Sequence, residues 1–193
     1  MKRINEIFYS VQGEGLHAGS PAVFIRFSGC NIRCPFCDTV HHDGAFMADE
    51  EIINEVAKYP TDLVVVTGGE PTMQLTEEFV EKLHELGKKV CIETNGTREV
   101  SRNIDFITLS PKFEFVKKAE CILTYCDELK VVYNGRNDMS LYDDIVANHY
   151  FLQPCDMGNE EENKRIMEAT VAYCLEHPKW RISLQTQKIL QVR

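Results

Sequence analysis

The feature that most constrains this chain is the alternation of short apolar runs with segments of helical periodicity. Several runs are nearly continuous in hydrophobicity, which is typical of strands covered on both faces. Apolar stripes with helical spacing lie between some of them, and Thr76, Asn159 and Gly87 stand where caps or stops are expected. The predicted strands cover residues 22–27, 63–66, 90–92, 106–109, 129–133, 150–152 and 182–184, and the predicted helical stripes cover 52–57, 75–86 and 166–175.

This order of elements favours parallel strands joined by right-handed crossovers, in an open sheet or a barrel. A complete eight-stranded barrel takes about 250 residues, whereas this chain has 193. The later connections are also too short for one helix each. We therefore predict an α/β fold, a partial, incomplete TIM-type barrel of mostly parallel strands in one domain, residues 1–193. Such a fold places its chemistry at the carboxyl ends of the strands.

Charge and hydropathy exclude several classes of function. The chain has 21 Lys and Arg against 30 Asp and Glu, a net charge of -9, and no segment gathers enough basic residues to offset this. A large nucleic-acid groove is therefore not expected. The apolar runs are far shorter than the ~18 residues of a membrane helix, and the first residues lack the apolar middle of a secretory signal. We expect a cytoplasmic protein with no membrane span.

Three cysteines carry the strongest chemical signal. Cys30, Cys34 and Cys37 follow directly after the apolar run 22–27, whereas the other five cysteines are scattered. In a reducing compartment such a group is typical of metal-binding or catalytic sites. Three thiolates on a [4Fe-4S] cluster leave the fourth iron open for an outside ligand. The alternative is a zinc site completed by His41 or His42.

Polar residues follow the predicted strands at their carboxyl ends. Thr67–Pro71 follows the second run, Glu93–Gly96 the third, Ser110–Lys112 the fourth and Gln153–Asp156 the sixth. In a partial barrel these segments converge on one mouth. Two glycines before Glu70 let the backbone approach a ligand closely, and a carboxylate suits an ammonium group.

The CxxxCxxC spacing and the Gly-Gly-Glu-Pro segment resemble the radical S-adenosylmethionine superfamily. The resemblance implies a radical SAM core with reduced helices, a [4Fe-4S] cluster held by the three cysteines, and S-adenosylmethionine on the open iron. By the same resemblance, the residues that bind S-adenosylmethionine are Phe36, Asp38, Gly69, Glu70, Ser110, Pro111, Lys112, Gln153, Pro154, Cys155 and Asp156.

Glu6–Gly15 and Pro21–Arg26 resemble the 7-carboxy-7-deazaguanine synthase family. Gln12 has donors and acceptors, and the guanidinium of Arg26 suits a substrate carboxylate; the alternative for Arg26 is an ion pair with an acid such as Glu14. Gly13-x-Gly15 is a poor phosphate-loop signal, because no strand of convincing length precedes it. The implied substrate-binding residues are Val11, Gln12, Gly13, Glu14, Arg26, Thr67 and Arg193, and the implied Mg²⁺ ligand is Thr39.

The activity that this resemblance implies is ring contraction of 6-carboxy-5,6,7,8-tetrahydropterin to 7-carboxy-7-deazaguanine with loss of ammonia, in queuosine precursor biosynthesis for tRNA. A 5'-deoxyadenosyl radical begins it by abstracting hydrogen from C6. The implied partners are an electron donor such as flavodoxin and a second copy of the chain in a homodimer. The N-terminal segment 1–20 binds substrate and the segment 181–193 closes the domain, although Gln187 stands where the family has histidine.

Two alternatives remain open. The first is another radical enzyme, an activase that makes a glycyl radical on a partner protein. The second is a zinc-stabilised binding module with Cys30, Cys34, Cys37 and His41 as ligands.

Overall fold

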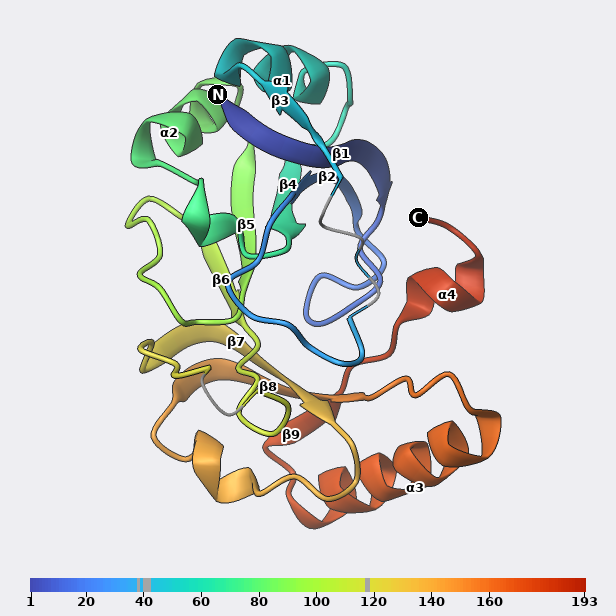
Figure 1. Ribbon diagram of the computed structural model, residues 1–193. Helices are drawn as coiled ribbons and strands as arrows, with labels where there is room; N and C mark the ends of the chain where they lie inside the picture. Colours follow the sequence, from blue (N-terminus) through green and yellow to red (C-terminus); the bar gives the residue numbers. More distant parts are fainter. Residues whose placement is uncertain (38, 40–42, 117–118) are drawn as a thin grey trace.

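The computed structural model describes residues 1–37, 39, 43–116 and 119–193 and shows, within these ranges, one open sheet of nine strands (Figure 1). β1 pairs antiparallel with both of its neighbours, and every other pairing is parallel. The predicted α/β fold of mostly parallel strands is therefore confirmed. In spatial order the strands are β3 (Ala45–Met47), β1 (Lys2–Val11), β2 (Pro21–Phe27), β4 (Leu63–Gly68), β5 (Lys89–Thr94), β6 (Phe106–Leu109), β7 (Tyr125–Tyr133), β8 (Val146–Pro154) and β9 (Trp180–Ile182).

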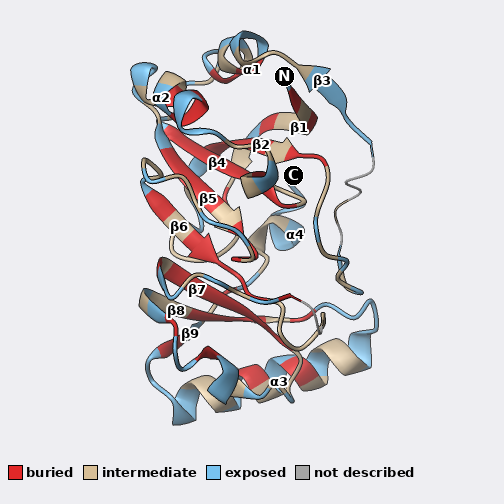
Figure 2. Cartoon of the chain, turned by 60° about the vertical axis from the view of Figure 1, so that its left-hand side comes forward, coloured by how far each residue is buried: buried red, intermediate tan, exposed pale blue. Residues whose placement is uncertain are grey.

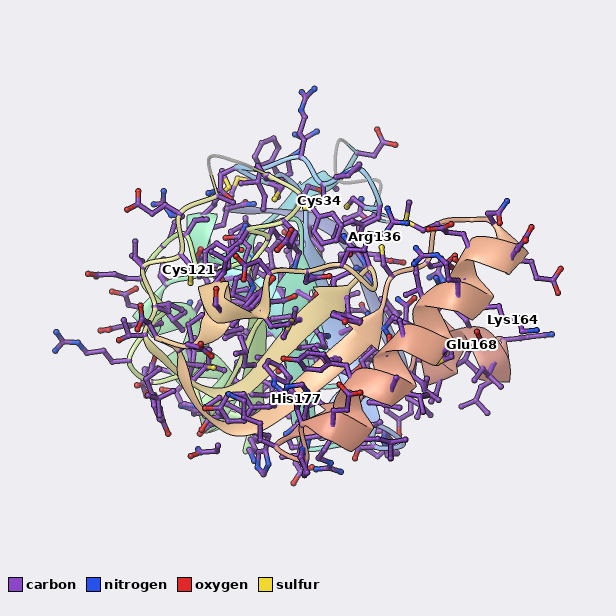
Figure 3. All side chains as sticks on the ribbon, turned by 90° about the horizontal axis from the view of Figure 1, so that it is seen from below. Cys34, Cys121, Arg136, Lys164, Glu168 and His177 are labelled. Carbon is purple, nitrogen blue, oxygen red and sulfur yellow. The ribbon has the colours of Figure 1, made fainter. Side chains whose placement is uncertain are left out.

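The first three helices cover the outer face of the sheet at its two ends (Figures 1 and 2). α1 (Asp49–Val56) and α2 (Glu77–Glu85) pack their apolar sides into one core cluster with β2 and β4. α3 (Glu160–Glu176) packs on β8 and β9, and its Lys164 and Glu168 point away from the sheet (Figure 3). The chain also contains two short 3-10 turns, Pro71–Met73 and Met139–Tyr142, and a final helix, α4 (Thr186–Leu190).

The predicted helix signals act as expected. The Thr76 side chain accepts a hydrogen bond from the Phe79 backbone nitrogen at the start of α2. The Asn159 side chain does the same for Glu162 at the start of α3. Gly87 follows α2 with φ of 71°, a conformation that costs glycine little. None of the helices in the described ranges is long and apolar enough to cross a membrane.

Alternation along the strands separates an outer face from an inner face. In β2, Val23, Ile25 and Phe27 join the core beneath α1 and α2, whereas Phe24 joins a second cluster on the inner side of the sheet. Successive side chains of a strand point to opposite faces, so Arg26 shares the inner face with Phe24. The same argument places polar side chains of the later strands in the interior of the partial barrel.

Two expectations about strands were wrong. A ten-residue strand, β1, does precede Gly13. It lacks a continuous apolar run because it lies next to the edge of the sheet and only some of its side chains are buried. The last strand covers Trp180–Ile182, not residues 182–184, because Ser183 and Leu184 lie beyond its pairing with β8.

Candidate active site

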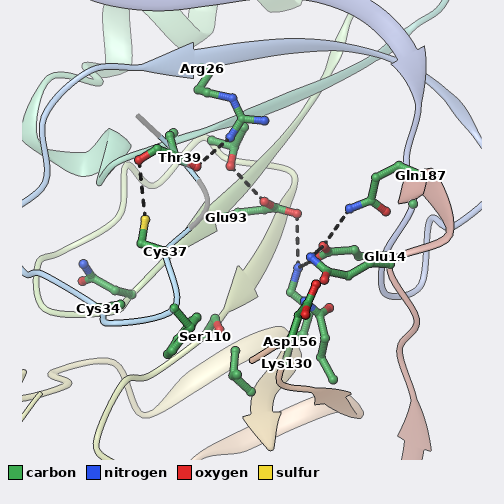
Figure 4. A pocket seen from close by; sticks show the side chains of 18 of the residues that line it. Glu14, Arg26, Cys34, Cys37, Thr39, Glu93, Ser110, Lys130, Asp156 and Gln187 are labelled. Atoms are coloured by element: carbon green, nitrogen blue, oxygen red, sulfur yellow. Dashed lines mark hydrogen bonds and ion pairs between the residues drawn. The ribbon is translucent and has the colours of Figure 1, made fainter. Parts of the chain in front are cut away.

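One cavity of about 450 Å³ opens at the carboxyl ends of β2 and β4 to β8 (Figure 4). Its volume is within the range of small-molecule sites. The loop after β1, the cysteine loop after β2 and the C-terminal segment around α4 complete its wall. The expected convergence of the polar strand ends on one mouth is thus what the structure shows.

The inner face of the sheet supplies the charged groups of the cavity. Strand alternation puts Thr67 of β4, Glu93 of β5 and Lys130 of β7 on the same side as Arg26. The Thr67 hydroxyl donates to Glu93 Oε2 at 2.9 Å, and Gln12 Nε2 donates to Glu93 Oε1 at 3.2 Å. The Glu93 carboxylate is therefore oriented from β4 and from the loop after β1.

Glu14, on the loop after β1, is held by three side chains. Lys130 Nζ lies 2.5 Å from Glu14 Oε2, while Gln185 and Gln187 donate to Glu14 Oε1 at 3.0 and 3.1 Å (Figure 4). Burial would raise the pKa of Glu14, but the Lys130 ammonium and the two amides lower it to about 2. The Glu14 carboxylate is therefore an ionised hydrogen-bond acceptor at neutral pH.

Arg26 forms an ion pair with an acid, which is the alternative to a substrate contact that the sequence leaves open. Its Nε pairs with Glu6 Oε1 at 3.0 Å, not with Glu14, because Glu6 lies directly across the β1–β2 pairing. Its Nη1 donates to Thr39 Oγ1 at 3.3 Å. The remaining N–H groups of the fork leave Arg26 with donors for an anion in the cavity.

Cys30, Cys34 and Cys37 all line this cavity. Burial raises the pKa of the Cys30 and Cys34 thiols above the ordinary value, and Lys112 opposes the rise at Cys34. Within the described ranges, no three His, Cys, Asp or Glu side chains converge on one point as a single ion would require. A [4Fe-4S] cluster makes no such demand, because each thiolate binds its own iron. Three soft donors on one open cavity fit such a cluster; His41 and His42 lie outside the described residues.

The Gly-Gly-Glu segment holds the start of the cysteine loop. Gly69 N donates to the Phe27 carbonyl at 3.0 Å, and Glu70 N donates to the Gly29 carbonyl at 2.9 Å. A Cβ on Gly69 would overlap the Gly29 carbonyl oxygen, so the close approach that glycine permits here is to the neighbouring loop. Gly68 and Gly69 also line the cavity.

Glu70 itself is completely buried. Its carboxylate accepts hydrogen bonds from Thr72 N and Oγ1, from Thr94 Oγ1 and from Asn95 N, at 2.6 to 3.1 Å. These bonds join β4 to the end of β5. Glu70 is not among the described residues that line the cavity, and its position makes it a brace for the residues that do.

The segments after β6 and β8 form the wall beside the cysteine loop. Lys112 Nζ donates to the Ser110 carbonyl and hydroxyl at 2.5 Å each, and burial lowers the pKa of Lys112 to about 8. Asp156 pairs with Lys188 Nζ at 2.6 Å, which ties α4 to the end of β8. Cys155 is buried against Phe36 and lines the same wall.

The structure therefore brings most of the predicted site residues together. Asp38 lies outside the described residues, and Glu70 and Pro111 are buried behind the wall. The predicted residues that line the cavity are Val11, Gln12, Gly13, Glu14, Arg26, Cys30, Cys34, Phe36, Cys37, Thr39, Thr67, Gly69, Ser110, Lys112, Gln153, Pro154, Cys155, Asp156 and Arg193.

Sequence reasoning missed several residues of the cavity. The resemblance assigns no role to Phe8 and Phe24, whose rings stack at 4.9 Å, or to Gln185, although all three line the cavity. Lys130 did carry a signal, since it is a single charge within the apolar run 129–133. Where helices cover one face of a sheet, a single charged residue in an apolar strand is expected on the opposite, inner face.

Comparisons with known proteins agree with this geometry. Residues 24–112 match the Radical SAM superfamily. The chain is 53% identical to 7-carboxy-7-deazaguanine synthase of Bacteroides thetaiotaomicron over 193 residues, which cover 100% of both chains. It is 36% identical to the enzyme of that name from Burkholderia multivorans, with 98% of each chain covered.

A solved structure is similar over nearly the whole chain. The crystal structure of QueE from Escherichia coli superposes with a TM-score of 0.79 at 25% identity, covering 95% of this chain and 93% of the other. Radical SAM proteins hold a [4Fe-4S] cluster and S-adenosylmethionine, and the three thiols on the cavity suit that pair. The chain belongs to the 7-carboxy-7-deazaguanine synthase family of radical SAM enzymes.

Proposed function

We propose that this protein converts 6-carboxy-5,6,7,8-tetrahydropterin into 7-carboxy-7-deazaguanine and ammonia, as a carbon–nitrogen lyase. The observation that carries the proposal is one cavity that is lined both by the three thiols and by the charged groups Glu14, Arg26, Glu93 and Lys130. The names of the full-length relatives support the same reaction. When bound, the cluster and S-adenosylmethionine supply the one-electron chemistry that produces a 5'-deoxyadenosyl radical.

The chain's own residues divide the cavity into two halves. Cys30, Cys34 and Cys37 would hold the cluster, and Ser110–Lys112 and Gln153–Asp156, at the ends of β6 and β8, would contact S-adenosylmethionine. The segment Gly69–Glu70 positions the methionine end through its backbone and through the Asn95 turn that Glu70 holds.

The opposite half binds the pterin. Arg26 offers its free N–H groups to the substrate carboxylate, as a fork of fixed charge. Gln12, Glu14 and Thr67 surround the position where the aminopyrimidinone ring is then held. Phe8 and Phe24 stack beside Arg26 and give the ring an apolar surface.

Thr39 and a magnesium ion are a further part of the proposal. The Thr39 hydroxyl accepts from Arg26 Nη1 and lines the cavity next to Cys37. One protein oxygen with water and substrate oxygens is a usual environment for Mg²⁺. The ion would then connect the cysteine loop to the substrate carboxylate.

Family membership supports the remaining parts of the proposal. Residues 1–193 act as one radical SAM domain, in which segments 1–20 and 181–193 complete the substrate half. Arg193 lies at the mouth, where its Nη1 is 3.3 Å from Glu6 Oε2. We infer a homodimer in the cytoplasm that receives electrons from a donor such as flavodoxin and supplies a queuosine precursor for tRNA.

Anaerobic incubation with dithionite, S-adenosylmethionine, Mg²⁺ and the carboxypterin tests the proposal. Mass analysis should show 7-carboxy-7-deazaguanine and 5'-deoxyadenosine. A brown protein that cleaves S-adenosylmethionine but leaves the pterin intact would favour the glycyl-radical activase. A colourless protein with one zinc per chain would favour the binding module.

A further inference from the structure

Lys130 lies in the middle of β7 with its side chain 7% exposed. Its ammonium is 2.5 Å from Glu14 Oε2 and 3.4 Å from Glu93 Oε1. These two carboxylates come from different parts of the chain, the loop after β1 and the end of β5, and both form an ion pair with this one residue. Figure 4 shows Lys130 between them.

The charged groups that face Lys130 come from every element packed around it. Glu14 and Glu93 are its direct partners, and Glu128 lies two residues earlier on the same face of β7. Lys112, beyond β6, adds a second positive charge at longer range. The C-terminal segment contributes only the amides of Gln185 and Gln187 to Glu14, so it brings no charge to that carboxylate.

Glu128 forms a hydrogen bond with the loop after β1 and not with a group in the cavity. Its Oε2 accepts from the backbone nitrogen of Leu16 at 2.6 Å, and a Cβ on Gly15 would overlap its Oε1. The Glu128 side chain therefore fixes the loop after β1 and does not reach the cavity wall. Of the carboxylates that face Lys130, Glu14 and Glu93 therefore remain for a ligand.

When the partners among the described residues are counted, each of these two carboxylates keeps room for one more donor. An ionised carboxylate has about four acceptor positions. Glu14 uses three of them, for Lys130, Gln185 and Gln187. Glu93 also uses three, for Lys130, Gln12 and Thr67. The Lys130 ammonium spans the two, so it sets the spacing of the two vacant positions.

We propose that Lys130 is a positioning residue for the pterin: it holds Glu14 and Glu93 side by side as acceptors for the N–H groups of the aminopyrimidinone edge. This inference rests on the proposed function and deepens it. Without the ammonium, the buried Glu14 carboxylate would lose its positively charged partner and would take up a proton more readily. A protonated carboxyl group presents a donor where the substrate also has donors, and binding would weaken.

The pKa values agree with this geometry. Burial would lower the pKa of Lys130, but Glu14, Glu93 and Glu128 raise it above the ordinary value, so the ammonium stays charged. Burial alone would raise the pKa of Glu14, and Lys130 reverses that direction. Removing Lys130 is therefore expected to raise the pKa of the Glu14 carboxyl group.

The test is the pH dependence of carboxypterin binding, measured by calorimetry on the cluster-loaded enzyme and its Lys130→Met variant. At low pH we expect the variant to bind about tenfold or more weakly, the loss of a hydrogen bond to a charged group. The loss should shrink as pH rises and the carboxylate re-ionises. The dissociation constant of the wild type should show no such change over the same pH range. KM should rise with the dissociation constant, and kcat should change less.

Lys82→Met is the matched control, because Lys82 pairs with Glu50 on the surface, far from the cavity. It should bind the pterin as the wild type does. An equal loss for Lys130→Met at every pH would mean a merely structural role and would overturn the proposal. So would an unchanged dissociation constant.

A double variant keeps the inference testable if Lys130→Met does not fold. Lys130→Met combined with Glu14→Gln leaves no unpaired ammonium and no unpaired Glu14 charge. A positioning residue acts through its partners, so the double variant should bind much as Glu14→Gln alone does. Fully additive losses would contradict the proposal. If the wild-type enzyme binds and converts the pterin but these variants do not differ as expected, only the role of Lys130 fails; if the wild type neither binds nor converts it, the proposed function fails as well.

Discussion

The buried carboxylate of Glu70 accepts a hydrogen bond from the backbone nitrogen of Asn95 at 2.8 Å. This bond connects the end of β4 to the turn after β5, and Asn95 Nδ2 in turn lies 3.1 Å from Asn31 Oδ1 in the cysteine loop. The Gly-Gly-Glu-Pro segment thus supports the cluster side of the cavity from behind. Its glycines carry the backbone contact with the loop, and its glutamate carries the contact with β5.

Glu70→Gln should destabilise the protein by about 1–3 kcal/mol, because the new amide group places a donor opposite a buried donor. Denaturant unfolding of the wild type and the variant measures the difference. Glu81→Gln is the control, since Glu81 is exposed and accepts from Asn103 on the surface, and such changes remain within about 0.5 kcal/mol. Equal stabilities for Glu70→Gln and the wild type would show that Glu70 does not brace the turn.

Cys34→Ala should lose the cluster, because one iron then has no protein ligand. Iron and sulfide content after anaerobic reconstitution measure the loss, and cleavage of S-adenosylmethionine should fall to background. Cys174→Ala is the matched control, since Cys174 lies on α3 and packs against a different core cluster. Retained cleavage with a full complement of iron in Cys34→Ala would remove Cys34 from the ligand set.

Thr39→Ala should weaken the response of turnover to Mg²⁺ while the cluster content stays unchanged, because the variant loses the proposed oxygen ligand. Thr39→Ser retains the hydroxyl and should behave more like the wild type. The measurement is a magnesium titration of product formation after removal of divalent cations. If Thr39→Ala and the wild type give the same titration curve, the ion is bound elsewhere.

Glu14 should make the stability of the chain depend on acid. Its pKa falls from the ordinary 4.5 to about 2 in the folded state, so the unfolded state binds the proton more readily. The stabilisation is then fully present above about pH 4.5 and is lost as pH falls towards 2. Unfolding free energies of the cluster-free chain should decline less steeply across this window in Glu14→Gln. Parallel curves for the two proteins would show that Glu14 is not ion-paired with Lys130.

The sequence predicted those parts of the fold that have a local signal. Continuous apolar runs located the central strands, and Thr76 and Asn159 located two helix starts. β1 was missed because its pattern is mixed, and its pairing with β2 becomes evident only in the sheet. The cysteine loop and the strand ends were predicted correctly because motif and topology point to the same edge.

The finer contacts of the site depend on pairs that lie far apart in the chain. Glu14 meets Gln185 and Lys130 across 171 and 116 residues, and no local pattern indicates such contacts. The acid that pairs with Arg26 is Glu6, and no local pattern indicates this pair either, since it depends on the register of β1 and β2. The position of Lys130 could have been predicted from the sequence, because strand alternation alone places it on the inner face.

The most direct test of the account uses carboxypterin that carries deuterium at C6. The reconstituted enzyme is incubated anaerobically with dithionite and S-adenosylmethionine, and the mass of the 5'-deoxyadenosine is measured. We predict that deuterium appears in the 5'-deoxyadenosine while 7-carboxy-7-deazaguanine accumulates. Unlabelled 5'-deoxyadenosine, with no deazaguanine formed, would contradict the assignment of this cavity to radical ring contraction.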